Sequence, residues 1–232
     1  MENDILELNN IKSNSLNGFN FSEIGDDHLF TNMDTPMREG AFDLSNEEKK
    51  DKIAGLFAEI MDVLGLDLTD DSLQGTPRRV AKMYIEEIFS GLDPRNKPKV
   101  ALFDNKYQYN QMLVEKNITF YSNCEHHFVP IIGKAHLAYI SSGKVIGLSK
   151  LNRIVQYYAK RPQVQERLTN QIAEELKAVL ETDDVAVIID AKHLCVSSRG
   201  VKDDTSSTVT AYYGGKFNSS SKINELLNYI NN

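Results

Sequence analysis

The sequence is poor in cysteine, lacks tryptophan and contains no long apolar run. Its 232 residues include two cysteines, Cys124 and Cys195. No stretch approaches the ~18 consecutive apolar residues of a membrane-spanning helix, so we expect no membrane span. The first residues are acidic and no apolar run follows them, which argues against a secretory signal and favours a reducing cytoplasm. A disulfide between the two cysteines is therefore disfavoured.

An excess of positive charge is also absent. The chain has 26 lysines and arginines against 33 acidic residues, a net charge of −7. This balance argues against a protein that coats nucleic acid, so we expect no nucleic-acid partner. It does not exclude a local basic pocket for a phosphate ligand, because net charge says nothing about a single cleft.

Both cysteines stand close to histidines. Cys124 and His127 are spaced C-x-x-H with His126 between them, and Cys195 follows His193 by two residues. One tight turn can offer a C-x-x-H pair to a single metal ion. A zinc bound by both thiolates would take one or two imidazoles, and three protein ligands would leave the open position typical of catalytic zinc. Free core cysteines and a disulfide are the alternatives.

Helical periodicity dominates the first part of the chain after residue 44. Residues 1–44 are polar without sustained periodicity, which predicts a poorly ordered extension. Ser45 and Glu48 form a capping box before a helix that ends at Gly65, with an apolar face. A second helix is expected to start with Thr76 as N-cap. The apolar face of the first helix comprises Ile53, Leu56, Phe57, Ile60, Met61 and Leu64.

The pattern then changes to alternation. Met112, Val114, Ile118 and Phe120 are expected to share one face of a strand, and a second strand follows over residues 135–139. Ser149 is expected to cap a helix, Pro162 separates it from another helix over 164–180, and strands are expected at 185–189 and 207–213. These elements predict an α+β fold with a largely antiparallel sheet and helices on one face. The predicted divisions are an extension (1–44), a helical region (45–98), a catalytic domain (99–217) and a C-terminal helix (218–232).

Several segments resemble the GTP cyclohydrolase I family. They occur in the family's order and span about Ser45 to Phe217. The segments are Thr76–Tyr84, Cys124–His127, Val145–Arg153, Arg161–Leu168 and His193–Gly200.

This resemblance implies a fold, an assembly and a reaction. The fold would be the tunnelling fold, whose sheets join into a barrel in a homodecamer with active sites at subunit interfaces. The reaction would convert GTP and water to 7,8-dihydroneopterin triphosphate and formate, the entry to folate or pterin synthesis. Zn²⁺ would be the cofactor of this cytoplasmic, allosteric enzyme, with neither a nucleic-acid nor a membrane partner.

The resemblance also implies roles for individual residues. The zinc ligands would be Cys124, His127 and Cys195. The acid–base residues would be His126 and His193. The guanine edge would be held by Glu166, with Gln165 beside it. The triphosphate and ribose would be held by Arg79, Lys150, Arg153, Arg199 and Ser149.

The chemistry of these residue types suits the implied reaction. One carboxylate such as Glu166 can accept from both adjacent guanine donors, N1–H and the N2 amine. An imidazole near its ordinary pKa can protonate the purine N7 and make C8 more electrophilic. Each assignment has an alternative: an orienting role for either histidine, a surface ion pair for Glu166, and a solvated charge for each cation. His136, in mid-strand, is expected to be structural.

Three other classes of protein remain open at this stage. A non-catalytic zinc protein would use the metal only to hold two strand ends together. A thiol redox protein would use the two cysteines, although no C-x-x-C supports it. A neighbouring tunnelling-fold enzyme would act on a pterin or deazapurine.

Overall fold

The computed structural model describes residues 32–232, of which residues 33–232 form one compact unit. Residues 1–31 of the predicted extension (1–44) lie outside the described residues. Residues 32–44 contain turns and bends without a helix or strand.

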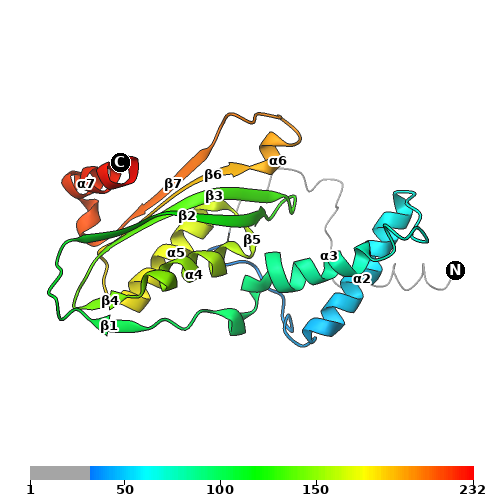
Figure 1. Cartoon of the computed structure of the whole chain (residues 1–232), viewed down its shortest axis with the longest axis horizontal. Coiled ribbons are helices and arrows are strands. Elements are labelled where there is room, and N and C mark those ends of the chain that lie inside the picture. Colours follow the sequence, from blue (N-terminus) through cyan, green and yellow to red (C-terminus); the bar gives the residue numbers. More distant parts are fainter. Residues whose placement is uncertain (1–31) are drawn as a thin grey trace. The chain divides into compact units, whose positions relative to one another are not determined.

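A five-stranded sheet forms the centre of this unit (Figure 1). Its spatial order is β5-β2-β3-β6-β7, and the neighbouring pairs β2–β3, β3–β6 and β6–β7 are antiparallel. The short β5 runs parallel to the end of β2. The predicted α+β class with a largely antiparallel sheet is therefore confirmed. The bounds are β2 Met112–Cys124, β3 Pro130–Ile140, β5 Pro162–Gln163, β6 Val185–His193 and β7 Thr208–Tyr213.

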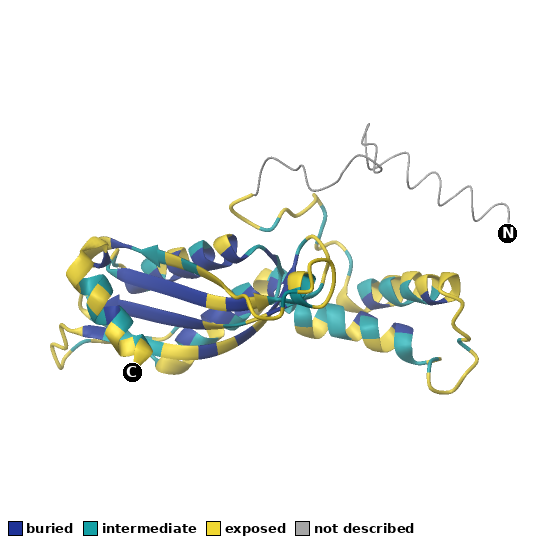
Figure 2. Cartoon of the chain, turned by 90° about the horizontal axis from the view of Figure 1, so that it is seen from above, coloured by how far each residue is buried: buried dark blue, intermediate teal, exposed yellow. Residues whose placement is uncertain are grey.

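Helices cover both faces of the sheet. The helices α4 (Leu148–Ala159) and α5 (Gln165–Leu180) bury one face, where Leu168, Ile172 and Leu176 are fully enclosed. The helix α7 (Ser220–Asn231) lies against the opposite face through Leu226 (Figure 1). The expectation of helices on one face is therefore wrong for α7. Figure 2 shows most of the central strand positions as buried, because they are covered from both sides.

A β-bulge makes one sequence prediction wrong. Glu115 pairs with Leu137 and Ile118 pairs with Ala135, so β2 advances three residues while β3 advances two. The extra residue reverses the direction of alternation. Met112 therefore packs in the cluster with α7, whereas Ile118 packs in the cluster under α4 and α5. The predicted common face of Met112, Val114, Ile118 and Phe120 does not exist.

The N-terminal helical region contains α2 (Asn46–Val63) and α3 (Thr76–Lys82), which packs on it. The capping box of Ser45 and Glu48 is present, and Gly65 follows α2 with a φ of 78°. Only part of the predicted apolar face of α2 is covered: Leu56, Ile60 and Leu64 are exposed. A π-helix, η1 (Met83–Ile88), continues α3, and two 3₁₀ turns, η2 (Ser90–Leu92) and η3 (Pro94–Asn96), follow it.

Two helices start earlier than expected, α3 by one residue and α4 by two residues. The helix α3 begins at Thr76 with Gly75 as N-cap, and α4 begins at Leu148 with Gly147 as N-cap. Neither N-cap makes a side-chain hydrogen bond, so Thr76 and Ser149 are not the caps that we expected.

The remaining elements are short. A separate two-stranded sheet joins β1 and β4, which the sequence did not indicate. These bounds are β1 Leu102–Asp104, β4 Lys144–Ile146, α6 Leu194–Ser197 and η4 Gly215–Asn218. Among the described residues, no helix has the length and apolar character needed to cross a bilayer.

Candidate metal centre and active site

The topology of the sheet brings the two cysteines together. Asn123, at the end of β2, pairs with Pro130 of β3, and the next β3 residue, Ile131, pairs with His193 at the end of β6. The ends of β2 and β6 therefore flank the start of β3. Cys124 is the last residue of β2, and Cys195 comes two residues after the end of β6. The sheet therefore brings the two cysteines close together although 70 residues lie between them in the sequence.

Cys124, His127 and Cys195 form a group that could hold a metal ion. One ligand atom from each residue lies within 4.8 Å of the others. The Cys124 Sγ is 3.9 Å from His127 Nδ1, and both cysteines are free thiols rather than a disulfide. Two sulfurs and one imidazole nitrogen are a donor set that zinc accepts, so the residues present fit the ion that the resemblance implies.

In the metal-free protein, the surroundings of Cys195 favour its neutral thiol form. Burial, together with the neighbouring Cys124, raises the pKa of the Cys195 thiol. Because thiolates are the metal-binding form, loading this group with a cation releases protons. On the exposed side of the group, Arg199 Nη1 lies 2.8 Å from His127 Nε2, so Arg199 stands next to the predicted ligands.

The two other predicted histidines stand close in sequence to the cysteines of this group, His126 after Cys124 and His193 before Cys195. His126 Nδ1 is 3.7 Å from Cys124 Sγ, and its Nε2 is 3.8 Å from a carboxylate oxygen of Glu125. His193 Nε2 is 2.7 Å from Gln165 Oε1. Burial lowers the pKa of His193, and the nearby Glu166 opposes this shift.

Gln165 fixes the orientation of His193. Its side chain is buried, and its amide nitrogen donates to the carbonyl oxygens of Ile189 and Thr208 at 3.2 and 2.8 Å. The remaining amide oxygen can only accept, so the neutral imidazole of His193 carries its proton on Nε2. Gln165 thus positions His193 in this chain, and its predicted contact with substrate stays a prediction. Glu166, the next residue, is exposed.

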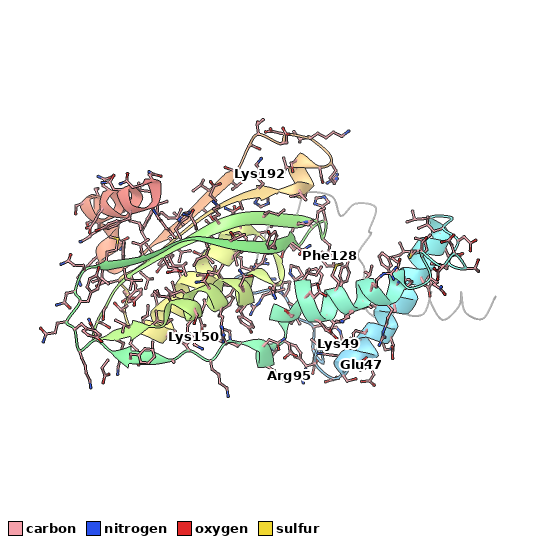
Figure 3. All side chains as sticks on the ribbon, viewed as in Figure 1. Glu47, Lys49, Arg95, Phe128, Lys150 and Lys192 are labelled. Atoms are coloured by element: carbon pink, nitrogen blue, oxygen red, sulfur yellow. The ribbon has the colours of Figure 1, made fainter. Side chains whose placement is uncertain are left out.

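A single chain does not bring the predicted phosphate ligands of α4 to the metal group. Asn152, near the start of α4, donates to Glu115 Oε1 at 3.1 Å. Glu115 lies nine residues before Cys124 on the same strand, a span of roughly 25–30 Å at the usual rise per residue. In Figure 3, Phe128 lies at one end of the β2–β3 pair, in the turn after Cys124, and Lys150 lies away from it, below the sheet near the start of α4. Ser149 and Arg153 lie within one helical turn of Lys150 in α4.

Arg79 is engaged locally. It lies on α3 and donates from Nη2 to Thr76 Oγ1 at 2.9 Å and to the Ser72 carbonyl oxygen at 3.2 Å. Its place in a phosphate site therefore stays a prediction.

A buried ion pair beside the metal group was not expected from the sequence. Glu125, between Cys124 and His126, binds Arg167, the third residue of α5. The only signal in the sequence was the position of both residues inside motifs of the resemblance, because neither burial nor pairing is visible in the residue pattern.

The fold and the site define an α+β protein with a metal-binding group of two thiols and one imidazole where adjacent strands end. The comparisons with known proteins are more specific. The profile of the family described as GTP cyclohydrolase I matches residues 53–231. The chain belongs to the GTP cyclohydrolase I family, which is a family of enzymes.

Relatives in several bacteria support this membership. The chain is 63% identical to GTP cyclohydrolase 1 of Flavobacterium johnsoniae over 208 residues, which cover 90% of this chain and 93% of that protein. It is 58% identical to GTP cyclohydrolase 1 of Vibrio parahaemolyticus over 81% of this chain and 85% of that protein. The corresponding protein of Escherichia coli O1:K1 is 55% identical with the same coverage. A weak structural likeness, from which we draw nothing, links 45% of this chain to 93% of an apo archaeosine synthase QueF-Like (TM-score 0.36, 17% identity).

Proposed function

We propose that this chain is a zinc-dependent GTP cyclohydrolase I that converts GTP and water to 7,8-dihydroneopterin triphosphate and formate. The single observation that supports this best is the convergence of Cys124, His127 and Cys195 at the strand ends, in a chain of this family. His193 stands two residues before Cys195, and Glu166 is close enough to His193 to affect its pKa; these two residues are the proposed proton carrier and guanine ligand.

Zinc is the ion that the donor set favours. Cys124, His127 and Cys195 would hold it through two thiolates and one imidazole. When bound with an open position, zinc supplies a Lewis acid that makes hydroxide available near neutral pH for attack on C8 of the purine. The two thiolates cancel the formal charge of the ion, so we expect nearby imidazoles to share the proton transfers.

His193 and His126 are the proposed proton carriers. Gln165 holds the His193 proton on Nε2, which leaves Nδ1 as the nitrogen able to exchange a proton with the substrate. The lowered pKa of His193 keeps this imidazole neutral at physiological pH and therefore able to accept a proton. His126, which is more exposed, would serve the second transfer during loss of formate.

Glu166 is the proposed guanine ligand. Its side chain is exposed, whereas its neighbours Gln165 and Arg167 are buried, so it is the residue of the first turn of α5 that remains free to bind a ligand. An ionised carboxylate accepts from guanine N1–H and N2 together, a pair of donors that adenine lacks. We therefore expect GTP to be preferred over ATP.

The triphosphate site is proposed to form between copies of the chain. A triphosphate carries about four negative charges and needs several cations. Arg199 stands at the metal group of its own chain, but Lys150 and Arg153 are too far along α4 to join it. The site is complete if a neighbouring copy supplies Lys150, Arg153 and Ser149 from its α4. Arg79 would come from the helical region of a copy that reaches the same site. This is the arrangement expected of a ring-shaped homodecamer in which tunnelling-fold sheets join into a barrel.

The direct test is release of formate from GTP by the purified protein. We expect turnover together with about one zinc per chain, loss of both after treatment with a strong chelator, and recovery when zinc is added back. ATP should yield no formate. A zinc-loaded, correctly folded protein that releases no formate from GTP would contradict the proposal and leave a structural zinc protein. Activity that survives removal of the metal would contradict the zinc dependence.

A further inference from the structure

A buried ion pair lies directly behind the metal-binding turn. Glu125 stands between Cys124 and His126, and Arg167 is the third residue of α5. The Arg167 side chain is 3% exposed and that of Glu125 is 19% exposed. The guanidinium donates from Nη1 to Glu125 Oε2 at 2.5 Å and from Nη2 to Oε1 at 3.2 Å. Such a two-pronged contact fixes both the distance and the orientation of the carboxylate.

Stability alone does not explain this pair. Transfer of two charges from water into a protein interior costs about as much as their attraction returns, so a buried pair contributes little net stability. Replacement by apolar residues would serve the fold equally well at a site that had no other requirement. The pair is therefore better explained by the position that it imposes on the turn.

One backbone hydrogen bond, from Glu125 N–H to the Gln163 oxygen at 3.0 Å, joins the turn to β5, and the Glu125 side chain joins it to α5. Backbone hydrogen bonds close it, from Cys124 N–H to the Val129 oxygen at 2.9 Å and from Phe128 N–H to the Cys124 oxygen at 2.8 Å. Phe128, labelled in Figure 3, has a φ of 54°, a left-handed conformation that closure of the turn requires. These bonds set the internal shape of the turn. The contact of Glu125 with Arg167 ties it to α5.

The first turn of α5 therefore reaches both strand ends of the metal group. Arg167 holds the loop that follows β2, and Gln165 holds His193, two residues before Cys195. Glu166 lies between these two residues in the sequence. One helical turn thus links the two halves of the metal group with the residue proposed to bind guanine.

We propose that Glu125 and Arg167 are positioning residues of the metal centre. Their ion pair fixes the loop with Cys124 and His127 against α5 and so sets the geometry in which the metal is held. This inference rests on the proposed function and extends it to a pair that is neither a predicted metal ligand nor a predicted substrate ligand.

The test compares metal binding by full-length variants. Glu125→Gln keeps the shape of the side chain and removes its charge, and Arg167→Lys keeps the charge and removes the two-pronged contact. We expect each to weaken zinc affinity by about 10–100-fold in competition with a chromophoric chelator. Co²⁺ bound in place of zinc should show a shifted visible spectrum, which reports the geometry of the thiolate ligands.

A matched control comes from the same helix. Lys177 of α5 forms ion pairs with Glu174 at 3.2 Å and Asp183 at 3.3 Å, away from the metal group. Lys177→Met should leave zinc affinity and the Co²⁺ spectrum unchanged. The double variant Glu125→Gln/Arg167→Lys should lose little more affinity than the weaker-binding single variant, because both changes break one contact.

The outcomes separate positioning from simple support of the fold. A folded Glu125→Gln protein with wild-type zinc affinity and Co²⁺ spectrum, and only a lower melting temperature, would overturn the inference. If Arg167→Lys does not fold, the isosteric Glu125→Gln decides alone. Metal titrations do not depend on turnover, so a wild-type protein that binds zinc but releases no formate would refute the proposed function and still test this pair.

Discussion

Buried polar side chains hold the proposed active-site residues of this chain in place. Gln165 and Arg167 are both nearly inaccessible to water, and each has a partner at a different strand end. A buried polar group without a partner is costly, so such residues are retained where their hydrogen bonds have a specific use. Glu166, which lies between them in the sequence and is the proposed guanine ligand, is exposed.

Cysteine and histidine spacing predicted the metal group, whereas its supporting residues could not be predicted. The spacing indicated a metal site of two thiols with one or two imidazoles, and the resemblance to the family implied that the imidazole is that of His127. The role of Arg167 depends on burial and on a partner 42 residues away in sequence. Neither property leaves a periodic or compositional signal.

His136 is a buried histidine on β3, and it behaves structurally, as the sequence indicated. Its Nδ1 lies 3.4 Å from the backbone nitrogen of Asn117, the bulge residue with a φ of 60°. Burial lowers the pKa of His136 from the ordinary value of 6.5; Asp190 opposes this shift, and Lys134 and Lys116 add to it. The imidazole is therefore neutral in the folded protein at pH 7 and accepts the Asn117 N–H.

We expect this histidine to make the folded state less stable in mild acid. Between pH 6.5 and the lower pKa of folded His136, this histidine is protonated in the unfolded chain and neutral in the folded protein. The free energy of unfolding therefore decreases as the pH falls through this range. Denaturant midpoints of the metal-free protein should therefore fall more steeply with acid than those of His136→Gln, which keeps an acceptor but does not titrate. Equal pH dependence of the two proteins would show that His136 does not contribute.

At the scale of elements, long and strongly periodic segments were predicted and local deviations were not. The helices after Ser45 and Pro162 and the buried strand from Val185 have continuous patterns that tertiary context reinforces. The bulge at Asn117 adds one residue and exchanges the faces of β2, which alternation alone cannot reveal. The three-residue strands β1 and β4 are too short to have a period, and they exist because they pair with each other.

The contact between the helical region and α4 depends on a glycine. Gly91 donates its backbone N–H to the Lys160 carbonyl oxygen at 2.9 Å. A Cβ atom at Gly91 would overlap the backbone carbonyl oxygen of Tyr157. Because both neighbours are backbone atoms, rotation of a side chain cannot relieve the clash.

Gly91→Ala is accordingly expected to destabilise the protein by about 1–3 kcal/mol through overpacking. Gly55→Ala is the control, because Gly55 lies inside α2 and a Cβ there meets nothing within 4 Å. That change should instead stabilise the chain by about 0.5–1 kcal/mol through helix propensity. Thermal or denaturant unfolding of both variants measures the difference. Similar midpoints for the two would mean that the contact at Gly91 is loose.

Two surface features of residues 32–232 bear on the proposed assembly. The exposed residues Leu56, Ile60, Val63 and Leu64 are clustered in the second half of α2. Within the described part of the chain, the edge strand β7 pairs only with β6 in the sheet order β5-β2-β3-β6-β7. An open edge and an exposed apolar face are both features that other copies of a chain can cover. They agree with the incomplete phosphate site of a single chain.

A mixing experiment between inactive variants tests whether the site is shared between copies. Cys195→Ser removes a metal ligand, and Lys150→Ala/Arg153→Ala removes the two cations of α4. Each protein alone is expected to be inactive. When the two are co-expressed and assemble at random, about one quarter of the interfaces should combine an intact metal group with intact cations from the neighbouring copy. Formate release should then recover to about a quarter of the wild-type rate, whereas mixing the separately purified, preassembled proteins should restore none. If co-expression restores nothing while both variants assemble normally, the metal group and the α4 cations must act within one chain, and α4 would have to move by most of the length of β2 to bring them together.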